Sequence, residues 1–463
     1  MKKVFCLSLC LFMAFGVLFT ACKGSDEKTK LDLKGATVTI MAQTTARDPR
    51  KDENAKTSVT YEKSVSHINQ VEADFNCKID VKSQNDWDAL DKDFLTAMAA
   101  GAPPADFISG DSAVGQPKYM LNGYLLPLND WMNVYDEGGT GSFDKNFSNA
   151  LTYDGKVYMV AAKGERPGEN VLFFNKRIFK ENPQLKDYDM YGMSKKGEMT
   201  WDKFREIAMK ATVDTNGDGT TDIMGIASQG LPGSIFNNAI VVSNGNFYIE
   251  YDKELGRDKV ILNNESGMRA LNFTFDLAMK DKVLGISGPY EGDWLYGRTA
   301  FQRAEAAMFV GGIGEVTQFT QLKTTDKYGF LPIPVGPDAG KVIKEISKTE
   351  FFAAIHTTNK ADLDNLPNKC KVLEALIAPQ DWAVPFAESW ETWCCDAEDV
   401  DMLDFFAKME NTFTFYQGYD QLRGAFIWSS CGMDQNIPPS TYVQEQLPAV
   451  EDQINTMWDQ KAQ

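Results

Sequence analysis

The chain has 463 residues, which exceeds one ordinary domain and favours at least two lobes. Hydrophobic residues make up 43% of it and charged residues 24%, values that exclude a wholly disordered chain and a membrane protein with many spans. The formal net charge of −18 repels nucleic acid and anionic lipid head groups, so we expect neither as a partner.

The N-terminal segment has the order of an export signal: two lysines, the apolar run VFCLSLCLFMAFGVLFT and then small residues. Over residues 1–21 it resembles a bacterial lipoprotein signal, in which Ala21 precedes the lipidated Cys22, although Phe19 stands where that pattern usually has Leu. Residues 22–35 are charged without an apolar period and predict a flexible tether. The alternative is an uncleaved anchor of about 17 apolar residues, at the short limit for a membrane span. Both interpretations place the protein outside the cytoplasm.

Strand and helix patterns alternate along the rest of the chain. The apolar spacing first predicts strands at 36–42, 77–83 and 105–110 and helices at 61–75 and 87–101. This alternation implies right-handed crossovers and a parallel sheet. The same grammar returns later, with strands predicted at 155–163, 170–179, 306–312 and 328–334 and helices at 200–212 and 266–281. The fold class is therefore α/β, in two lobes.

Six segments follow one another in an order that is typical of one family. They are FLTAMAAGAPPADFIS, YMLNGYLLPLNDWM, LFFNKRIFKE, MTWDKFREIAMKAT, AEAAMFVGG and YGFLPIPVGP. In this order they resemble the extracellular solute-binding proteins of bacterial ABC importers, in the branch that includes maltodextrin and other sugar binders. The resemblance spans most of residues 36–455.

What the resemblance implies is a two-lobed periplasmic-binding-protein-like fold (type II), with a ligand cleft between lobes joined by a hinge. By the family's order, residues 36–152 plus 350–412 form the first lobe and residues 153–349 plus 413–463 the second. The implied protein is a monomer that performs no covalent chemistry. It captures a small solute, expected to be a mono- or oligosaccharide, and delivers it to the permease subunits of an ABC transporter. It touches the membrane of the cell envelope through its lipid anchor alone.

Candidate ligand-binding residues follow from two arguments. In open α/β sheets a ligand lies beyond the carboxyl ends of the strands, which selects Gln43, Thr44 and Asp111. Family position adds aromatic faces for sugar rings and polar groups for hydroxyls, at Glu169, Asn170, Phe236, Asn237, Trp294, Tyr419, Arg423 and Trp428. One departure is that Ile313 stands where many sugar binders have an aromatic residue, so no stacked sugar is expected there.

Other interpretations stay open at this point. The same scaffold is similar to binders of polyamines, metal complexes and oxyanions, and a surface lipoprotein could have kept the fold for adhesion. An exported glycan-active hydrolase is the alternative from another class. It has little support, because the chain lacks G-x-S-x-G, H-E-x-x-H and a phosphate-binding P-loop, and has only two histidines.

Five cysteines remain after the predicted lipidation site. They are Cys77, Cys370, Cys394, Cys395 and Cys431. Export permits disulfides, but the spacing does not fix any pairing. The adjacent Cys394 and Cys395 lack the C-x-x-C spacing of a redox or zinc site, so a structural role is expected.

The stretch DTNGDGTTDIMG resembles a calcium-binding loop. Oxygen ligands at the spacing of an EF-hand would come from Asp214, Asn216, Asp218, Thr220 and Asp222. The twelfth position, which normally holds a bidentate Glu, is Gly225, and a predicted strand rather than a helix follows it. A structural Ca²⁺ is therefore one interpretation, and a glycine-rich turn held by Asx hydrogen bonds without metal is the other.

Overall fold

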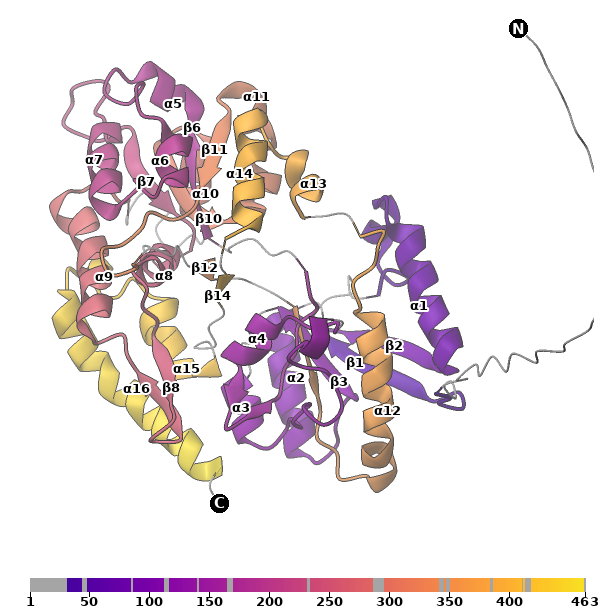
Figure 1. The fold of residues 1–463 in the computed structure, drawn as a ribbon. Helices are drawn as coiled ribbons and strands as arrows, with labels where there is room; N and C mark the ends of the chain where they lie inside the picture. The colour runs from indigo at the N-terminus through magenta and orange to yellow at the C-terminus, as the bar shows by residue number, and fades with distance from the viewer. Residues whose placement is uncertain are drawn as a thin grey trace, which may run out of the picture.

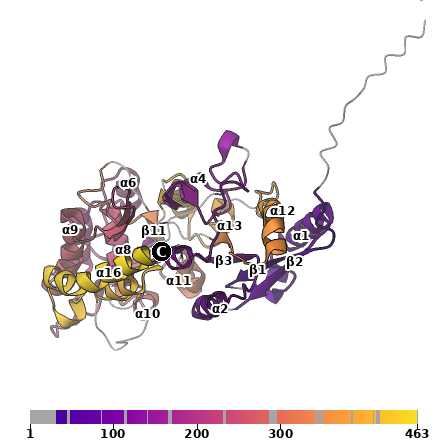
Figure 2. The same ribbon diagram turned by 90° about the horizontal axis from the view of Figure 1, so that it is seen from below.

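The computed structural model describes residues 31–461 apart from 44–47, 85, 112–115, 140, 165–169, 231–233, 286–294, 341–344, 347–349, 384–385, 410 and 413–417. The predicted export signal, with Cys22, lies outside the described residues. Two lobes lie side by side, each built on a four-stranded sheet (Figures 1 and 2). No helix in the described part of the chain is long and apolar enough to cross a membrane.

The first lobe contains a sheet with the strand order β13-β3-β1-β2. Its strands are β1 (Thr37–Ala42), β2 (Lys78–Ser83), β3 (Phe107–Asp111) and β13 (Glu350–Ala354). Its helices are α1 (Tyr61–Phe75), α2 (Trp87–Ala99), α3 (Gln116–Leu121), α4 (Lys145–Ala150) and α12 (Lys360–Leu376). Strand β1 pairs in parallel with β2 and β3, as the alternation predicts, whereas β13 arrives from the second lobe and runs antiparallel to β3.

Successive side chains of β1 pack into two separate hydrophobic cores. Ile40 packs in one cluster with Ile68 of α1 and Leu366 of α12, whereas Met41 packs on the opposite face with Phe94 of α2. This follows from the two-residue period of a strand, which points successive side chains to opposite faces. The first sheet is thus covered by α1 and α12 on one face and by α2 on the other.

The second lobe is built on a mixed sheet with the strand order β11-β6-β10-β7. Its strands are β6 (Asn170–Asn175), β7 (Met224–Ser228), β10 (Ala306–Gly312) and β11 (Tyr328–Leu331). Helices between these strands are α5 (Lys176–Glu181), α6 (Met190–Lys195), α7 (Trp201–Ala211), α8 (Ser234–Ser243), α9 (Glu265–Phe275), α10 (Tyr296–Gln302) and α11 (Thr320–Thr325). Strand β6 runs antiparallel to both β10 and β11, while β10 and β7 are parallel.

The C-terminal part of the chain completes this lobe. Its helices are α13 (Phe386–Glu391), α14 (Ala397–Ala407), α15 (Asp420–Leu422) and α16 (Pro439–Lys461).

The remaining strands of the molecule form three short pairs. They are β4 (Thr152–Tyr153) with β5 (Lys156–Val157), β8 (Ile249–Asp252) with β9 (Arg257–Val260), and β12 (Glu345–Ile346) with β14 (Asn411–Thr412).

The strand predicted at 328–334 ends as β11 at Leu331, and two other predicted strands are shortened further. The strand predicted at 170–179 ends at Asn175, whose side-chain oxygen accepts a hydrogen bond from the backbone N–H of Ile178 at 3.0 Å and so caps α5. The strand predicted at 155–163 is reduced to β5 and a single bridge between Val160 and Phe352. In both segments the apolar residues are buried as predicted. The strand conformation ends early because Asn175 caps α5 in one segment and the short β4–β5 hairpin forms in the other.

The lobe boundaries differ from those that the resemblance implies. Residues 153–162 stay with the first lobe, where Val160 pairs with Phe352 of β13. Helix α14, assigned to the first lobe by the resemblance, packs on β11 and α6 of the second. The buried Asp399 of α14 holds it there by accepting hydrogen bonds from Tyr191 and, at 3.1 Å, from Lys176. The last crossing into the second lobe therefore comes before α13, near residue 380 and not at 412.

The segment predicted as a tether enters the fold before residue 35. Leu33 is only 6% exposed, belongs to the core beneath α1, and donates a backbone hydrogen bond to Phe75 at 2.9 Å. The first lobe thus includes the described residues from Leu31 onward.

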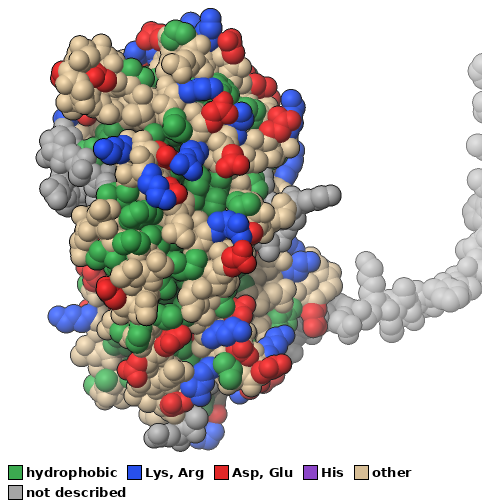
Figure 3. Space-filling view, turned by 90° about the vertical axis from the view of Figure 1, so that its left-hand side faces the viewer, with side chains coloured by type: hydrophobic (Ala, Val, Ile, Leu, Met, Phe, Trp, Pro, Cys, Tyr) green, Lys and Arg blue, Asp and Glu red, His purple; other side chains and the backbone are tan. Residues whose placement is uncertain are grey.

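The surface charge is mixed in sign over the face shown in Figure 3, where acidic and basic side chains are interspersed with apolar ones. The large negative net charge is therefore not gathered into a single acidic patch on this face.

Candidate functional site

The site is defined by the carboxyl ends of the parallel strands in both lobes. In the first lobe the incoming chain enters β13 at Glu350, which pairs with Asp111 at the carboxyl end of β3. In the second lobe it enters β6 at Asn170, which pairs with Gly312 at the carboxyl end of β10. Because the crossing segments join these two edges, each edge lies on the side of its lobe that faces the waist (Figure 1).

A small two-stranded sheet occupies the waist itself. Strands β12 and β14 pair in parallel there, between the two large sheets (Figure 1). Strand β12 contacts α8 of the second lobe, and β14 contacts α4 of the first. Short paired strands between two lobes are the kind of element about which a hinge moves.

Three predicted residues lie at these edges, two selected by the strand-end argument and one by family position. Gln43 directly follows β1 and is partly buried, and Asp111 is the last residue of β3. Asn170 begins β6 and is 6% exposed. The predicted residues Thr44, Glu169 and Trp294 lie outside the described residues.

Phe236 and Asn237 both lie on α8, but their side chains are in the interior. Phe236 is fully buried and stacks on Phe204 of α7, with ring centroids 6.1 Å apart, so it is a core residue. Asn237 is 1% exposed, and neither of its side-chain polar atoms finds a hydrogen-bond partner among the described residues.

The three predicted residues from 419 to 428 divide into one core residue and one exposed pair. Tyr419 is fully buried, donates a hydrogen bond to Asp258 at 2.7 Å and accepts one from Trp458 at 2.8 Å. Arg423 and Trp428, in contrast, form a cation–π pair, with the guanidinium carbon 4.7 Å from the ring centroid. Trp428 is 39% exposed and presents an apolar ring to solvent.

The stacked pair sits beside the first lobe. Arg423 forms an ion pair with Asp420 at 3.1 Å, and Asp420 lies 3.6 Å from Lys118 of α3. Lys118 is also paired with Asp91 of α2 at 3.1 Å. A chain of alternating charges therefore runs from α2 and α3 of the first lobe to the base of Trp428 in the second.

Three polar residues at the waist edge of the second sheet were missed by the sequence analysis. They are Gln229, which follows β7, Arg298 of α10, and Glu315, which follows β10. Gln229 donates to Glu315 at 2.8 Å, and Arg298 forms a two-bond ion pair with the same carboxylate. The rule that selected Gln43 and Asp111 would have found Gln229 and Glu315 if applied to β7 and β10.

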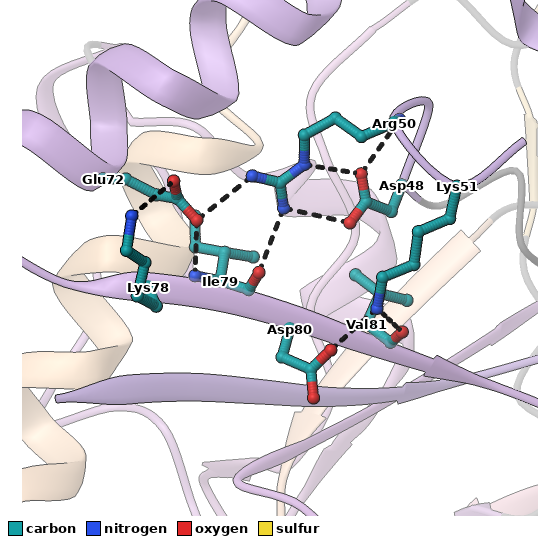
Figure 4. A network of polar contacts seen from close by, with 8 residues as sticks. All are labelled: Asp48, Arg50, Lys51, Glu72, Lys78, Ile79, Asp80 and Val81. Carbon is teal, nitrogen blue, oxygen red and sulfur yellow. Dashed lines mark hydrogen bonds and ion pairs between the residues drawn. The ribbon is translucent and has the colours of Figure 1, made fainter.

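The loop that follows β1 is fixed by a polar network (Figure 4). Arg50 pairs through two nitrogens with Asp48, at 2.8 and 2.9 Å, and through the third with Glu72 at 3.1 Å. It also donates to the backbone carbonyl of Ile79 at 3.0 Å. Burial by itself raises the pKa of Asp48, but the hydrogen bonds and charge of Arg50 outweigh it and hold that pKa below its ordinary 3.8. The network thus anchors the chain just beyond Gln43 to α1 and β2.

The calcium-like loop is closed by its own side chains. Asp214 accepts backbone hydrogen bonds from Gly217 at 2.6 Å and Gly219 at 2.8 Å, which lowers its pKa. Asp222 accepts from the backbone N–H of Thr215 at 2.7 Å. Among the described residues, no three or more His, Cys, Asp or Glu side chains are grouped so that they could hold a metal ion. These contacts are those of an Asx-type turn, and Ca²⁺ binding by this loop stays a prediction.

A hollow of about 420 Å³ lies at the opposite edge of the first sheet. Its lining includes Thr37 and Thr39 from the start of β1, Asp106, and Lys369, which pairs with Asp106 at 2.6 Å. Since it opens at the amino ends of the strands, it is not on the waist side where the two lobes meet.

All five described cysteines are free thiols. Burial raises the pKa of Cys370, Cys394 and Cys431 to about 12 in each case. These three side chains are therefore uncharged at neutral pH and poor nucleophiles.

Two α/β lobes joined by crossing segments, with polar residues at the strand ends that face the waist, define a two-lobed binding protein. The sequence matches the family model described as bacterial extracellular solute-binding protein over residues 68–362, which is more than half of the chain. The protein belongs to this family. Its fold is accordingly the type II periplasmic-binding-protein-like fold, with the ligand cleft between the lobes.

Solved structures show the same fold at low sequence identity. The maltose/maltodextrin-binding domain MalE from Bdellovibrio bacteriovorus, bound to maltotriose, is 18% identical, with a TM-score of 0.55 over 90% of this chain and 100% of that one. An ABC substrate-binding protein from Listeria monocytogenes, in complex with cycloalternan, is 14% identical, with a TM-score of 0.59 over 91% and 99%. A solute-binding protein from Thermotoga lettingae, bound with alpha-D-tagatose, is 16% identical, with a TM-score of 0.54 over 91% and 100%. None of the curated protein sequences compared with the chain matches it.

Proposed function

We propose that this protein captures a mono- or oligosaccharide between its lobes and delivers it to the permease of an ABC transporter, without covalent chemistry. The observation that carries the proposal is the Arg423–Trp428 pair. Trp428 is 39% exposed and is stacked on a guanidinium that Asp420 holds in place. A flat apolar ring beside fixed hydrogen-bond donors matches the two surfaces of a sugar, its C–H face and its hydroxyl edge.

The similar structures support the same ligand class. Those cited above are complexes with maltotriose, cycloalternan and tagatose, which are all carbohydrates. We also propose that the mature chain is a monomer held at the cell envelope by lipid on Cys22. The lipoprotein-like signal pattern of residues 1–22 supports this anchor. The family is extracellular, and a freely diffusing receptor would be lost from a cell that has no outer membrane.

Thermal unfolding in the presence of a solute panel tests the ligand class. A ligand that binds only the folded state raises the melting temperature by an amount that grows with its concentration relative to its Kd. We expect at least one neutral mono- or oligosaccharide to raise the melting temperature of the mature protein. A clear response to a polyamine, a metal complex or an oxyanion, with none to any sugar, would contradict the proposal. The lipid is tested by mass spectrometry of protein expressed with its own signal, and Cys22→Ala should abolish the added mass.

A further inference from the structure

The Gln229–Arg298–Glu315 network lies where the waist edge of the second sheet meets α10. Gly297 brings α10 directly onto the end of β7, because a Cβ at this position would lie 2.0 Å from the backbone oxygen of Ser228. Only glycine permits this approach, and it sets the adjacent Arg298 beside Gln229 and the turn after β10. The absence of a side chain at residue 297 therefore allows the close helix–strand contact that positions the Arg298 guanidinium.

The guanidinium is held in one orientation. Arg298 pairs with Glu315 through Nε and, at 2.7 Å, through Nη2, and the Glu315 side chain is only 6% exposed. Gln229 donates to the same carboxylate at 2.8 Å and accepts a hydrogen bond from the backbone N–H of Gly312 at 3.1 Å. Two parallel N–H···O bonds to one carboxylate fix a guanidinium plane more firmly than a single contact does.

Arg298 retains donors that the network does not use. Its side chain is 19% exposed, and no hydrogen bond joins its Nη1 to another described residue. Because Glu315 neutralises the guanidinium at contact distance, the pair presents N–H donors without a net charge. Such donors suit the lone pairs of neutral hydroxyl groups and give no net attraction to an anion.

The adjoining turn offers no aromatic ring for stacking. Ile313 is 8% exposed and packs in the core, and a Cβ at Gly314 would meet nothing within 4 Å. The described turn after β10 thus supplies no aromatic platform, so recognition by this turn depends on hydrogen bonds.

We infer that Arg298, positioned by Glu315 and Gln229, is a specificity-determining residue that binds adjacent hydroxyls of an uncharged sugar. This rests on the proposed function and deepens it in two respects. The second lobe recognises the hydroxyl edge of the sugar, while Trp428 supplies the apolar face, and the site selects neutral sugars over sugar acids.

The test compares neutral sugars with their acidic counterparts, using glucose and galactose, their oligosaccharides, and glucuronate and galacturonate as probes in calorimetric titrations. Glu315→Gln keeps the shape of the side chain but leaves the Arg298 charge uncompensated. We expect it to raise the affinity for the sugar acids relative to the neutral sugars by at least about tenfold. The double variant Arg298→Met with Glu315→Gln removes both charges together, so no unpaired charge is buried, and should bind the neutral sugar at least about tenfold more weakly.

Arg269→Gln is the matched control, because Arg269 of α9 is 44% exposed and pairs with Glu265 of the same helix and with Asp338. It should leave both affinities unchanged. If wild-type protein binds a sugar while Glu315→Gln leaves the ratio of the affinities for acidic and neutral sugars unaltered, Arg298 only stabilises the position of α10. The inference is then wrong, while the proposed carbohydrate function stands. If wild-type protein binds no sugar of any kind, the carbohydrate function falls, and this inference with it. Should the double variant fail to fold, the ratio measured on Glu315→Gln decides.

Discussion

Trp428 is an exposed aromatic side chain that contacts the Arg423 guanidinium. A large ring that is 39% exposed gains less stability from burial than a core ring does. We expect Trp428→Ala to weaken sugar binding by about 1–2 kcal/mol, roughly tenfold in Kd, with little loss of melting temperature. Titration calorimetry with the sugar found in the thermal panel measures this. Leu255→Ala, at an exposed apolar side chain of the β8–β9 hairpin, should change nothing. Equal affinities for all three proteins would remove Trp428 from the site.

Asp48 makes a residue-scale prediction about acid stability. Its folded-state pKa is below the ordinary 3.8, so near that pH the unfolded chain binds more protons than the folded one. The Asp48–Arg50 pair therefore stabilises the fold above this range, and its contribution is lost as the pH falls through the lower, folded-state pKa. Asp48→Asn should cost about 2–3 kcal/mol at pH 7, less than for a fully buried pair because Arg50 is 25% exposed.

Urea unfolding at pH 7 and pH 3 measures that difference. The gap between Asp48→Asn and wild type should shrink at pH 3. The control is Asp80→Asn, since Asp80 pairs with Lys51 at the surface with 43% exposure. It should cost little at either pH. A gap for Asp48→Asn that is the same at both pH values would mean that its cost is steric and not electrostatic.

At the scale of elements, the loop 214–222 joins α7 to β7, and its sequence resembles a calcium-binding loop. We propose that Ca²⁺ binds there, with Asp214, Asp218 and Asp222 turned from their backbone partners toward the ion. A bound ion would raise the melting temperature on adding CaCl₂ and lower it with chelator, because it stabilises the folded state only. Asp214→Asn should abolish this response while leaving the sugar response intact. An unchanged melting temperature in wild-type protein, with and without chelator, would show that the Asx hydrogen bonds hold the loop unaided.

The elements that sequence predicts best are those in which one face is strongly apolar. The helix predicted at 200–212 is an example, since the buried residues of α7 repeat at the helical period: Trp201, Phe204, Ile207, Ala208 and Ala211. The helix α14 was assigned to the wrong side of the waist because its anchor is polar and distant in sequence. Lys176 and Tyr191 contact Asp399 across more than 200 residues of sequence, and no local sequence pattern predicts such a contact.

The strand-end rule places Gln43 and Asp111 at the carboxyl ends of β1 and β3, and their contact with a ligand stays a prediction. Phe236 and Tyr419 were selected by family position as aromatic residues, and both are fully buried. Aromatic type alone does not separate a platform from a core residue, because both bury apolar area. Arg298 was missed because its place depends on the close packing of Gly297 on β7, which only the three-dimensional structure shows.

At the scale of the whole molecule, the C-terminal helix α16 joins the lobes. Trp458 near its end packs against Tyr153 of β4 in the first lobe, with ring centroids 5.8 Å apart, and against Tyr251 of β8 in the second, at 5.7 Å. Its indole N–H donates to Tyr419 at 2.8 Å. Helix α16 also contacts α3 of the first lobe. Because the last helix contacts both lobes, we expect its packing in the second lobe to contribute to the stability of the first.

Two buried tryptophans allow this coupling to be tested against a matched control. Trp458 is 6% exposed and touches both lobes, whereas Trp201 is 4% exposed and stacks on Phe273 within the second lobe, with centroids 4.5 Å apart. Truncation of either to Ala should cost about 3–5 kcal/mol, since both lose a large buried ring. Hydrogen exchange then separates them: Trp458→Ala should reduce protection in β4, β5 and α3 of the first lobe, and Trp201→Ala should not. Equal protection of these elements in both variants would mean that the lobes are stabilised independently, with α16 belonging energetically to the second lobe alone.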